Sequence, residues 1–218
     1  MSGLFGGTKI ETSAPVISSL KLQTSCYGRA KPWIFGLVRV TPNIIDYVDF
    51  TSIPHTTTQK TGKGGGGSQS NTTYSYTVAT IMAIGSGPIA CVRRMWQDKD
   101  VTSPGSLRLD LYLGDLEQMP WPYMASRHPE RALSYRGLAY AASGAFDLGD
   151  SAGFGNHSME VQAPNSIASK YPGSNVPDAE VADVISAILT DVNQGIGLDR
   201  DRVDGLEQFR SFCLASGI

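Results

Sequence analysis

The stretch SCYGRAKPWIFGLVRVTPNIIDYVDF, residues Ser25–Phe50, sets aromatic and β-branched side chains between Gly-Arg, Lys-Pro and Thr-Pro-Asn breaks. Aromatic and β-branched residues are enriched in strands, whereas Gly, Pro and Asn interrupt them. The pattern predicts strands at Trp33–Val40 and Ile44–Phe50. Because the apolar run in the first of these is continuous, we expect both of its faces to be covered, as in a central strand.

The segments around this stretch extend the β-rich pattern. Residues 1–15 are rich in Gly, Ser and Thr and end at a proline, which predicts a mobile or partner-bound arm outside the core. A strand is expected at Val16–Thr24. Residues 51–73 have no apolar side chain after Ile53, so we predict an extended loop or flexible hairpin tip that adds nothing to a core. The strands on either side of its Gly64–Gly67 tract are expected to pair.

Further strands are predicted where apolar residues alternate with polar ones or form short runs. They are Tyr74–Ile84, Ile89–Trp96, Leu107–Leu113, Tyr135–Phe146 and His157–Val161. The proline-broken stretch 119–130 has room only for short helical turns. Strands therefore dominate most of the chain.

Two helices are predicted near the end of the sequence. The first follows Asp178 as N-cap and stops near residues 193–195. Its apolar face consists of Val181, Val184, Ile185, Ile188 and Leu189. The second begins with Asp204 as N-cap and Glu207 three residues later. It is expected to bury Leu206, Phe209 and Cys213.

These elements predict the α+β class: mainly antiparallel β, as a barrel or sandwich, with an extended hairpin loop and two C-terminal helices. We expect an N-terminal arm at 1–15, a β-rich domain at 16–175 that contains the loop 51–73, and a helical segment at 176–218. At 218 residues the chain is long enough to bury a core without disulfides or metal.

Composition excludes several classes of function. The 18 basic and 20 acidic residues leave a net charge of −2 and form no long block, so no nucleic-acid site is expected. No segment approaches the roughly 20 apolar residues of a membrane span, and the N-terminus lacks the pattern of a secretory signal. Synthesis in the cytoplasm without membrane insertion is therefore expected. Only 17% of residues are charged, which favours a chain that covers part of its surface in an assembly.

No residue is assigned a catalytic, cofactor-binding or metal-binding role. Cys26, Cys91 and Cys213 lack metal or redox spacing and are interpreted as buried thiols. His55, His128 and His157 each lie beside turn residues, and a Cys–His dyad stays open as an alternative.

Three weaker patterns are interpreted as structural. Lys63 and the glycine tract after it lack the spacing of a phosphate-binding loop. Asp115, Asp147 and Asp150 lie in Gly-rich stretches but lack calcium-loop spacing. Two carboxylate pairs are interpreted as solvated loop features without a catalytic role. They are Asp199 with Asp201 and Asp110 with Asp115.

The sequence resembles the N-terminal portion of the tail hub, or tail tip, protein of long-tailed bacteriophages, a family that includes lambda-like host-specificity proteins and the hub of gene transfer agents. The resemblance lies in the segments GLFGG (3–7), LQTSCYGRAKPWIFGLVRVTPNIIDYVDF (22–50), TGKGGGGS (61–68), TYSYTVATIMAIGSGPI (73–89), SRHPERALSYRGLAYAASGAFDLGDSAGFGNHSMEV (126–161), PDAEVADVISAILTDVNQGIGL (177–198) and FCLASGI (212–218). These segments span nearly the whole chain.

The resemblance implies a structural, non-enzymatic virion component at the tip of the tail tube, assembled in the host cytoplasm. It implies a homotrimer that joins the ring of distal tail proteins to the central spike or fibres and contacts the tape measure protein. Two alternatives remain open. One is a tail-associated cysteine peptidase, and the other is a receptor- or carbohydrate-binding module that would expose Trp33, Trp96 or Trp121 in a groove.

Overall fold

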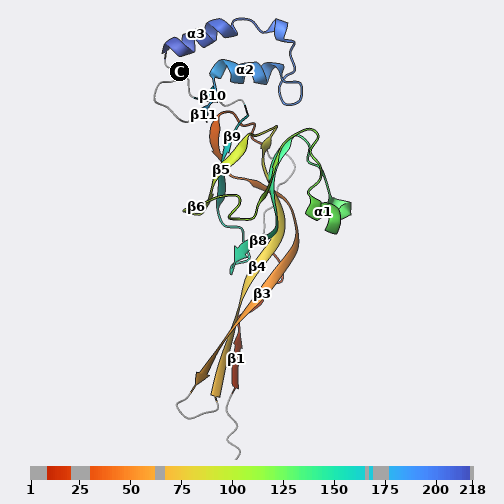
Figure 1. The fold of residues 1–218 in the computed structure, drawn as a ribbon, viewed down its shortest axis with the longest axis vertical. Coiled ribbons are helices and arrows are strands. Elements are labelled where there is room, and N and C mark those ends of the chain that lie inside the picture. Colours follow the sequence, from red (N-terminus) through yellow and green to blue (C-terminus); the bar gives the residue numbers. More distant parts are fainter. Residues whose placement is uncertain (1–8, 21–29, 62–66, 165–166, 169–176, 217–218) are drawn as a thin grey trace, which may run out of the picture.

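The computed structural model describes residues 9–20, 30–61, 67–164, 167–168 and 177–216 (Figure 1). Mainly antiparallel sheets form its body, and two of its three α-helices lie in the C-terminal part. The α+β class predicted from the sequence is confirmed, with two packed sheets as in a sandwich. A long ribbon of strands extends from one end of the body, and the C-terminal helices lie at the other end.

The first sheet is built around β4, the longest strand. Its strands are β1 (Lys9–Ser13), β3 (Asn43–Thr61), β4 (Gly67–Ser86), β7 (Asp110–Leu113) and β8 (Leu138–Gly149). Within the body the order is β3-β4-β8-β7, with every neighbour antiparallel. Beyond the end of β8, the distal part of β4 pairs instead with β1, in parallel, along Ser68–Thr72.

The second sheet packs against one face of the first. It has the antiparallel order β2-β9-β5-β6, from β2 (Leu37–Val40), β9 (His157–Gln162), β5 (Cys91–Gln97) and β6 (Asp100–Thr102). The main core lies between the sheets. Its fully buried side chains include Val78, Met82 and Ile84 from β4, Ala139 and Ala141 from β8, Met95 from β5, and Met159 and Val161 from β9.

A short helical layer covers the opposite face of the first sheet. It consists of α1 (Pro122–Arg127) and the 3-10 turn η1 (Pro129–Arg131). Trp121 and Met124 pack there against Ala79 and Ile81 of β4 and Tyr140 of β8. Because β4 is covered on both faces, its apolar run is continuous rather than alternating. The short helical turns predicted for 119–130 are confirmed.

The C-terminal part contains β10 (Ile167–Ala168), β11 (Pro177–Asp178), α2 (Val181–Thr190), η2 (Arg200–Arg202) and α3 (Leu206–Ser216). The Arg210 guanidinium on α3 joins the helices through Glu180, at 2.6 Å, and Asp183, at 2.5 Å. Both predicted helices are present. Among the described residues, no helix has the length and apolar character needed to cross a membrane.

Neither predicted helix cap is confirmed. The residue before α2 is Glu180, and the Asp178 carboxylate accepts the backbone N–H of Ala179 instead. Helix α3 begins at Leu206, directly after Gly205, whose φ of +80° lies in the left-handed region. Of the residues expected to be buried in this helix, Cys213 is buried, whereas Phe209 is 37% exposed.

The predicted strand Trp33–Val40 is wrong in extent and position. Gly36 has a φ of +66°, so the run is broken there and only Leu37–Val40 forms β2. Strand β2 lies at the edge of the second sheet, and Val38 is 37% exposed. The strand predicted at Leu107–Leu113 is also shorter. It begins at Asp110, because Arg108 has a φ of +52°.

The long polar segment is strand rather than loop. Strand β3 continues to Thr61 and β4 starts at Gly67, so most of residues 51–73, expected to be an extended loop or flexible hairpin tip, form a regular hairpin. The predicted pairing of the two flanking strands is confirmed, with Thr61 opposite Gly67. Residues 62–66 lie outside the described residues. Of the strand predicted at Val16–Thr24, the described part, residues 16–20, is not strand.

Candidate functional site

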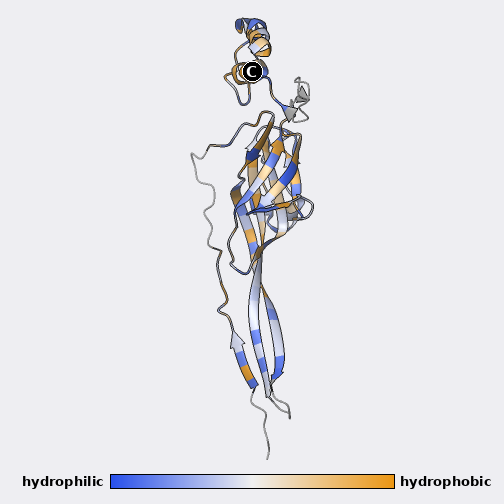
Figure 2. Ribbon diagram, turned by 90° about the vertical axis from the view of Figure 1, so that its left-hand side faces the viewer, coloured by the Kyte–Doolittle hydropathy of each residue, from blue (hydrophilic) through white to orange (hydrophobic). Residues whose placement is uncertain are grey.

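The most unusual feature of the molecule is the ribbon that leaves the body, which we call the arm. It consists of β1, residues Thr51–Thr61 of β3 and residues Gly67–Ser75 of β4 (Figure 1). At about 3.3 Å per residue, its β3 part is about 35 Å long. No described side chain of the arm is buried, and blue and pale colours dominate it in Figure 2.

Side-chain hydroxyls connect the two long strands of the arm. Thr56 lies directly opposite Thr72, and Thr58 opposite Ser70, and each pair of hydroxyls is 3.0 Å apart. The His55 Nε2 atom lies 2.7 Å from the Ser75 hydroxyl on the neighbouring strand. Such cross-strand pairs stabilise a hairpin that has no core beneath it. The arm is therefore ordered by its backbone and hydroxyl pairs.

Both long edges of the arm are open among the described residues. Strand β3 pairs only with β4, and β1 pairs only with β4 from the other side. All five side chains of β1 are exposed, including Ile10 at 53%. Pro54 lies within β3, a position that an edge strand tolerates because one side of its backbone needs no partner. An open edge is a surface on which another strand can add.

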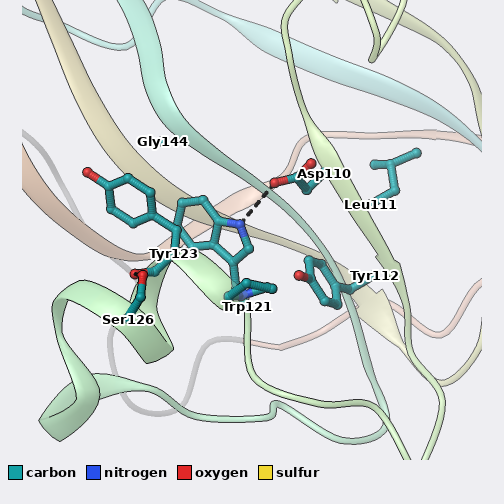
Figure 3. A pocket seen from close by; sticks show the side chains of 8 residues that line it. Asp110, Leu111, Tyr112, Trp121, Tyr123, Ser126 and Gly144 are labelled. Atoms are coloured by element: carbon teal, nitrogen blue, oxygen red, sulfur yellow. Dashed lines mark hydrogen bonds between the residues drawn. The ribbon is translucent and has the colours of Figure 1, made fainter.

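An aromatic groove lies on the α1 face of the first sheet, where β7 ends and β8 continues (Figure 3). Its volume is about 700 Å³. Its walls are Asp110, Leu111 and Tyr112 of β7, Trp121, Pro122, Tyr123 and Ser126 at α1, and Gly144 of β8. The Trp121 indole N–H donates to the Asp110 carboxylate at 2.9 Å. This hydrogen bond fixes the groove's buried wall.

Stacked rings hold the groove in shape. Trp121 stacks on Tyr123 with ring centroids 4.8 Å apart, and Tyr112 stacks on Tyr140 at 4.3 Å. A methyl group at Gly144 would lie 2.9 Å from the Tyr123 ring, so only glycine admits this contact without a shift. Burial raises the pKa of Tyr112, Tyr123 and Tyr140. Burial disfavours the charged phenolate, so these three side chains act as neutral aromatic walls.

A polar clip attaches the α1 layer to the base of the arm. Asp49 lies at a bulge in β3. Its Oδ2 atom accepts a hydrogen bond from the Tyr123 hydroxyl at 2.7 Å and lies 2.9 Å from His128 Nε2. Arg131 pairs with Asp46 on the same strand. The hydrogen bond with His128, followed by that from Tyr123, lowers the pKa of Asp49. No local sequence pattern pointed to Asp49, Tyr123 or Arg131, because the partners in this clip come from distant segments.

The described cysteines and histidines do not form a dyad. Cys91 lies opposite Gln162, and His157 lies opposite Gln97 at the other end of the same strand pair, about 17 Å away. The Cys91 thiol is half-buried, within 4.0 Å of the Gln162 side chain, whereas Cys213 is buried in α3. Burial is therefore as predicted for Cys213 and only partial for Cys91. Cys26 lies outside the described residues.

The tryptophans and carboxylates named from the sequence are dispersed. Trp33 packs on Phe35, and Trp96 lies on the second sheet beside Arg39. Trp121 is buried and forms part of the wall of the aromatic groove. The Asp147 carboxylate accepts the N–H of Gly149 within its own turn. Asp199 is within 3.9 Å of Arg202. Within the described ranges, no three His, Cys, Asp or Glu side chains gather as metal ligands.

No protein-family model matches the chain, and no curated protein matches it. Among solved structures it is similar to a chain from the virion of a native gene transfer agent particle, with 18% identity and a TM-score of 0.45. The match covers 100% of this chain and 44% of that one, so the chain spans less than half the length of the protein that it matches. A TM-score below 0.5 is too low to transfer the neighbour's fold or role.

Proposed function

We propose that this chain is a structural component of a bacteriophage tail tip, a baseplate hub subunit that joins the distal tail ring to the central spike or fibres. The proposal places the protein in the tail of the virion. It is supported by the sequence resemblance to hub proteins and by the shape of the molecule. The arm is the observation on which it depends most.

The arm has properties that fit an interface rather than a free surface element. A two-stranded hairpin without a hydrophobic face has marginal stability in water, and even with β1 the arm buries no described side chain. Its strands are nevertheless regular over about 35 Å. Contacts from neighbouring subunits would supply the burial that one chain lacks. A closed ring, proposed here as a trimer, would also cover the open edges of β1 and β3.

The opposite end of the molecule offers a second contact surface. Large apolar side chains are exposed along α2, α3 and the loop between them. They are Val181, Ile188, Val192, Ile196, Leu198, Phe209, Phe212 and Leu214. Orange patches mark this end in Figure 2. Exposed apolar clusters of this kind usually mark protein interfaces, so we assign this surface to the distal tail, spike, fibre or tape measure neighbours.

The proposed role is structural rather than catalytic. The described residues place Cys91 and His157 at opposite ends of a strand pair, which disfavours the peptidase alternative. The groove residues comprise one carboxylate and one serine hydroxyl, with neither histidine nor cysteine among them. Such a set can bind a partner but offers no paired nucleophile and base.

Removal of the arm tests the proposal. His55 and Thr73 lie directly opposite each other, so residues 56–72 can be replaced by Asn-Gly as a two-residue hairpin turn. The body should keep its fold, because its buried residues begin at Tyr76 on β4. We expect the shortened chain to lose self-association in analytical ultracentrifugation and to be absent from purified tail particles.

Circular dichroism and thermal unfolding of the shortened chain serve as the control for an intact body. The full-length chain, prepared in parallel, should self-associate and be detected in particles by mass spectrometry. Equal incorporation of the two chains would show that the arm has no role in assembly. A full-length chain that stays monomeric and is absent from particles would refute the proposed function as a whole.

A further inference from the structure

A second cavity, distinct from the aromatic groove, lies at one end of the second sheet. The end of β2, the β5–β6 turn and the start of β9 converge there. The lining residues are Arg39, Thr41, Asp98, Asn156, His157 and Ser158. The cavity volume is about 380 Å³, within the usual range for small-molecule sites.

Arg39 is held in place on the rim of this cavity. Its guanidinium carbon lies 4.0 Å from the centroid of the Trp96 ring, and its Nε–H donates to the Ser158 hydroxyl at 2.7 Å. Stacking and the hydrogen bond together fix the plane of the guanidinium group before any ligand arrives. The entropic cost of ordering this long side chain on binding is thereby reduced.

The charge of Arg39 has no carboxylate partner among the described residues. Arg94, beside the same indole, differs in this respect, because it forms a bidentate pair with Glu160 at 2.9 and 3.0 Å. With its Nε–H bound to Ser158, Arg39 keeps four Nη–H donors in the fork geometry that matches a carboxylate or phosphate. The cavity therefore presents one guanidinium fork that forms no salt bridge with a described carboxylate and can bind an oxyanion.

The other polar groups suit hydroxyls rather than a second negative charge. The Asp98 carboxylate accepts the backbone N–H and the side-chain N–H of Asn156, both at 3.3 Å, which fixes both residues. Its carboxylate can also accept a hydrogen bond from a ligand hydroxyl, while Thr41 and Asn156 can donate or accept hydrogen bonds. Because Asp98 is negative, a bare multivalent anion is disfavoured. A ligand that has one anionic group, bound by Arg39, and hydroxyl groups beside it matches these polar side chains.

The geometry points to a binding site for an acidic saccharide, whose carboxylate or phosphate pairs with Arg39 and whose ring hydroxyls contact Asp98, Asn156 and Thr41. Uronic acids and sugar phosphates share this chemistry. The site lies on the second sheet, away from the arm, so the inference stands independently of the proposed assembly role. It would give the protein a contact to acidic sugars in addition to its protein neighbours.

Titration with four small molecules tests the site, with the Trp96 indole N–H resonance as reporter and Trp96→Phe used for its assignment. The probes are glucuronate, glucose 6-phosphate, glucose and inorganic phosphate. We expect at least one acidic sugar to bind at least tenfold more tightly than both glucose and inorganic phosphate. Preference for glucuronate or for glucose 6-phosphate then distinguishes a carboxylate from a phosphate source. Equal binding of all four probes, or binding of none, would overturn the proposal.

Variants of Arg39 distinguish binding by the planar guanidinium group from an effect of net positive charge. Arg39→Ala should weaken binding of the acidic sugar at least tenfold, and Arg39→Lys should restore only part of it, since lysine lacks the planar fork. Arg93→Ala is the matched control, because it removes one exposed cation from the same sheet without lining the cavity. An equal loss in Arg93→Ala and Arg39→Ala would reduce the effect to net charge and sink the assignment. Unchanged amide spectra of both variants establish that the fold is retained.

Discussion

Gln118 connects the loops that flank α1. Its Oε1 atom accepts the N–H of Gly114, and its Nε2 group donates to the carbonyls of Ser134, Tyr135 and Leu138 at 3.0–3.2 Å. The side chain is 9% exposed, so water cannot readily replace these partners. One glutamine thus fixes the β7–α1 loop against the segment that leads into β8.

Substitution of Gln118 should be costly for this reason. Gln118→Ala leaves buried carbonyls and an N–H unpaired, and we expect a loss of about 2–3 kcal/mol of unfolding free energy. In a chain of this size that corresponds to a fall of roughly 5–10 °C in Tm. Urea and thermal unfolding measure it, with exposed Gln208→Ala on α3 as the control. Similar stability of the two variants would contradict the role of Gln118.

The Asp49 clip gives an acid-dependent contribution to stability. The pKa of this carboxyl is lowered in the folded state, chiefly by the hydrogen bond with His128. Its stabilisation is therefore complete above the unfolded-state pKa, near 4, and is lost as the pH falls through the lower folded value. Because the side chain is 36% exposed, solvent screening limits the effect to about 0.5–1 kcal/mol.

We expect the stability gap between wild type and Asp49→Asn to be present at pH 5 and to narrow as the pH falls toward 2. Urea unfolding at a series of pH values measures the gap. Asp100→Asn, at an exposed position on β6, should follow the wild-type curve throughout. A gap that does not depend on pH would show that Asp49 acts through packing rather than through its charge.

The predicted strand bounds were wrong at residues with left-handed backbone angles. Gly36 and Arg108 end strands that the apolar pattern alone extends. The pattern around Gly36 gave no sign of the close approach there, where an added methyl would lie 3.1 Å from the backbone nitrogen of Ala179. That contact joins segments more than 140 positions apart, so a reading of local periodicity could not include it.

At the scale of elements, the sequence predicted most of the strands, both C-terminal helices and the pairing of β3 with β4. It did not predict that the polar part of β3 is a regular strand. The alternation of Tyr74, Tyr76 and Val78 identified β4, and the apolar face of α2 identified that helix correctly. The polar composition of the Thr-rich part of β3 predicts an extended loop or flexible hairpin tip, because none of its residues can enter a core. Threonine nevertheless favours strands, and backbone pairing with β4 is enough to hold them. The absence of burial therefore did not imply the absence of regular structure.

Strand β1 should stabilise the arm locally and the body very little. Deletion of residues 1–13 removes the parallel partner of Ser68–Thr72, and we expect the β4 amides that face β1 to exchange at least tenfold faster. Because all five side chains of β1 are exposed, Tm should change by less than about 2 °C. Hydrogen exchange measures the effect, with the amides of Ala139–Ala142 as internal control. Unchanged protection of Ser68–Thr72 would show that β1 does not pair there in solution.

At the scale of the whole molecule, the exposed apolar surface of the helices is expected to matter for assembly and not for folding. Phe212 and Val192 are 62% and 81% exposed, so their joint replacement by serine should change the unfolding free energy by less than about 0.5 kcal/mol. Incorporation into tail particles should fall several-fold. Val101→Ser, 60% exposed on β6, is the matched control. Incorporation equal to that of the control would exclude this surface as an interface.

The overall architecture follows from the sequence better than the binding sites do. Short strands broken by Gly and Pro, followed by two amphipathic segments, predicted the α+β class that the structure has. The aromatic groove and the Arg39 cavity each combine side chains from three separate segments. Arg39 and Asn156 stand 117 positions apart, and their meeting depends on the β2–β9 register, which no local pattern specifies.

The hydroxyl pairs of the arm recur every second residue, at Thr56 with Thr72 and at Thr58 with Ser70. Insertion of two residues into each strand would move the tip outward by about 7 Å and keep the same face of hydroxyls. A single residue added to each strand would turn that face over. The ribbon can therefore act as a spacer whose reach changes in fixed steps while the sandwich beneath it stays the same.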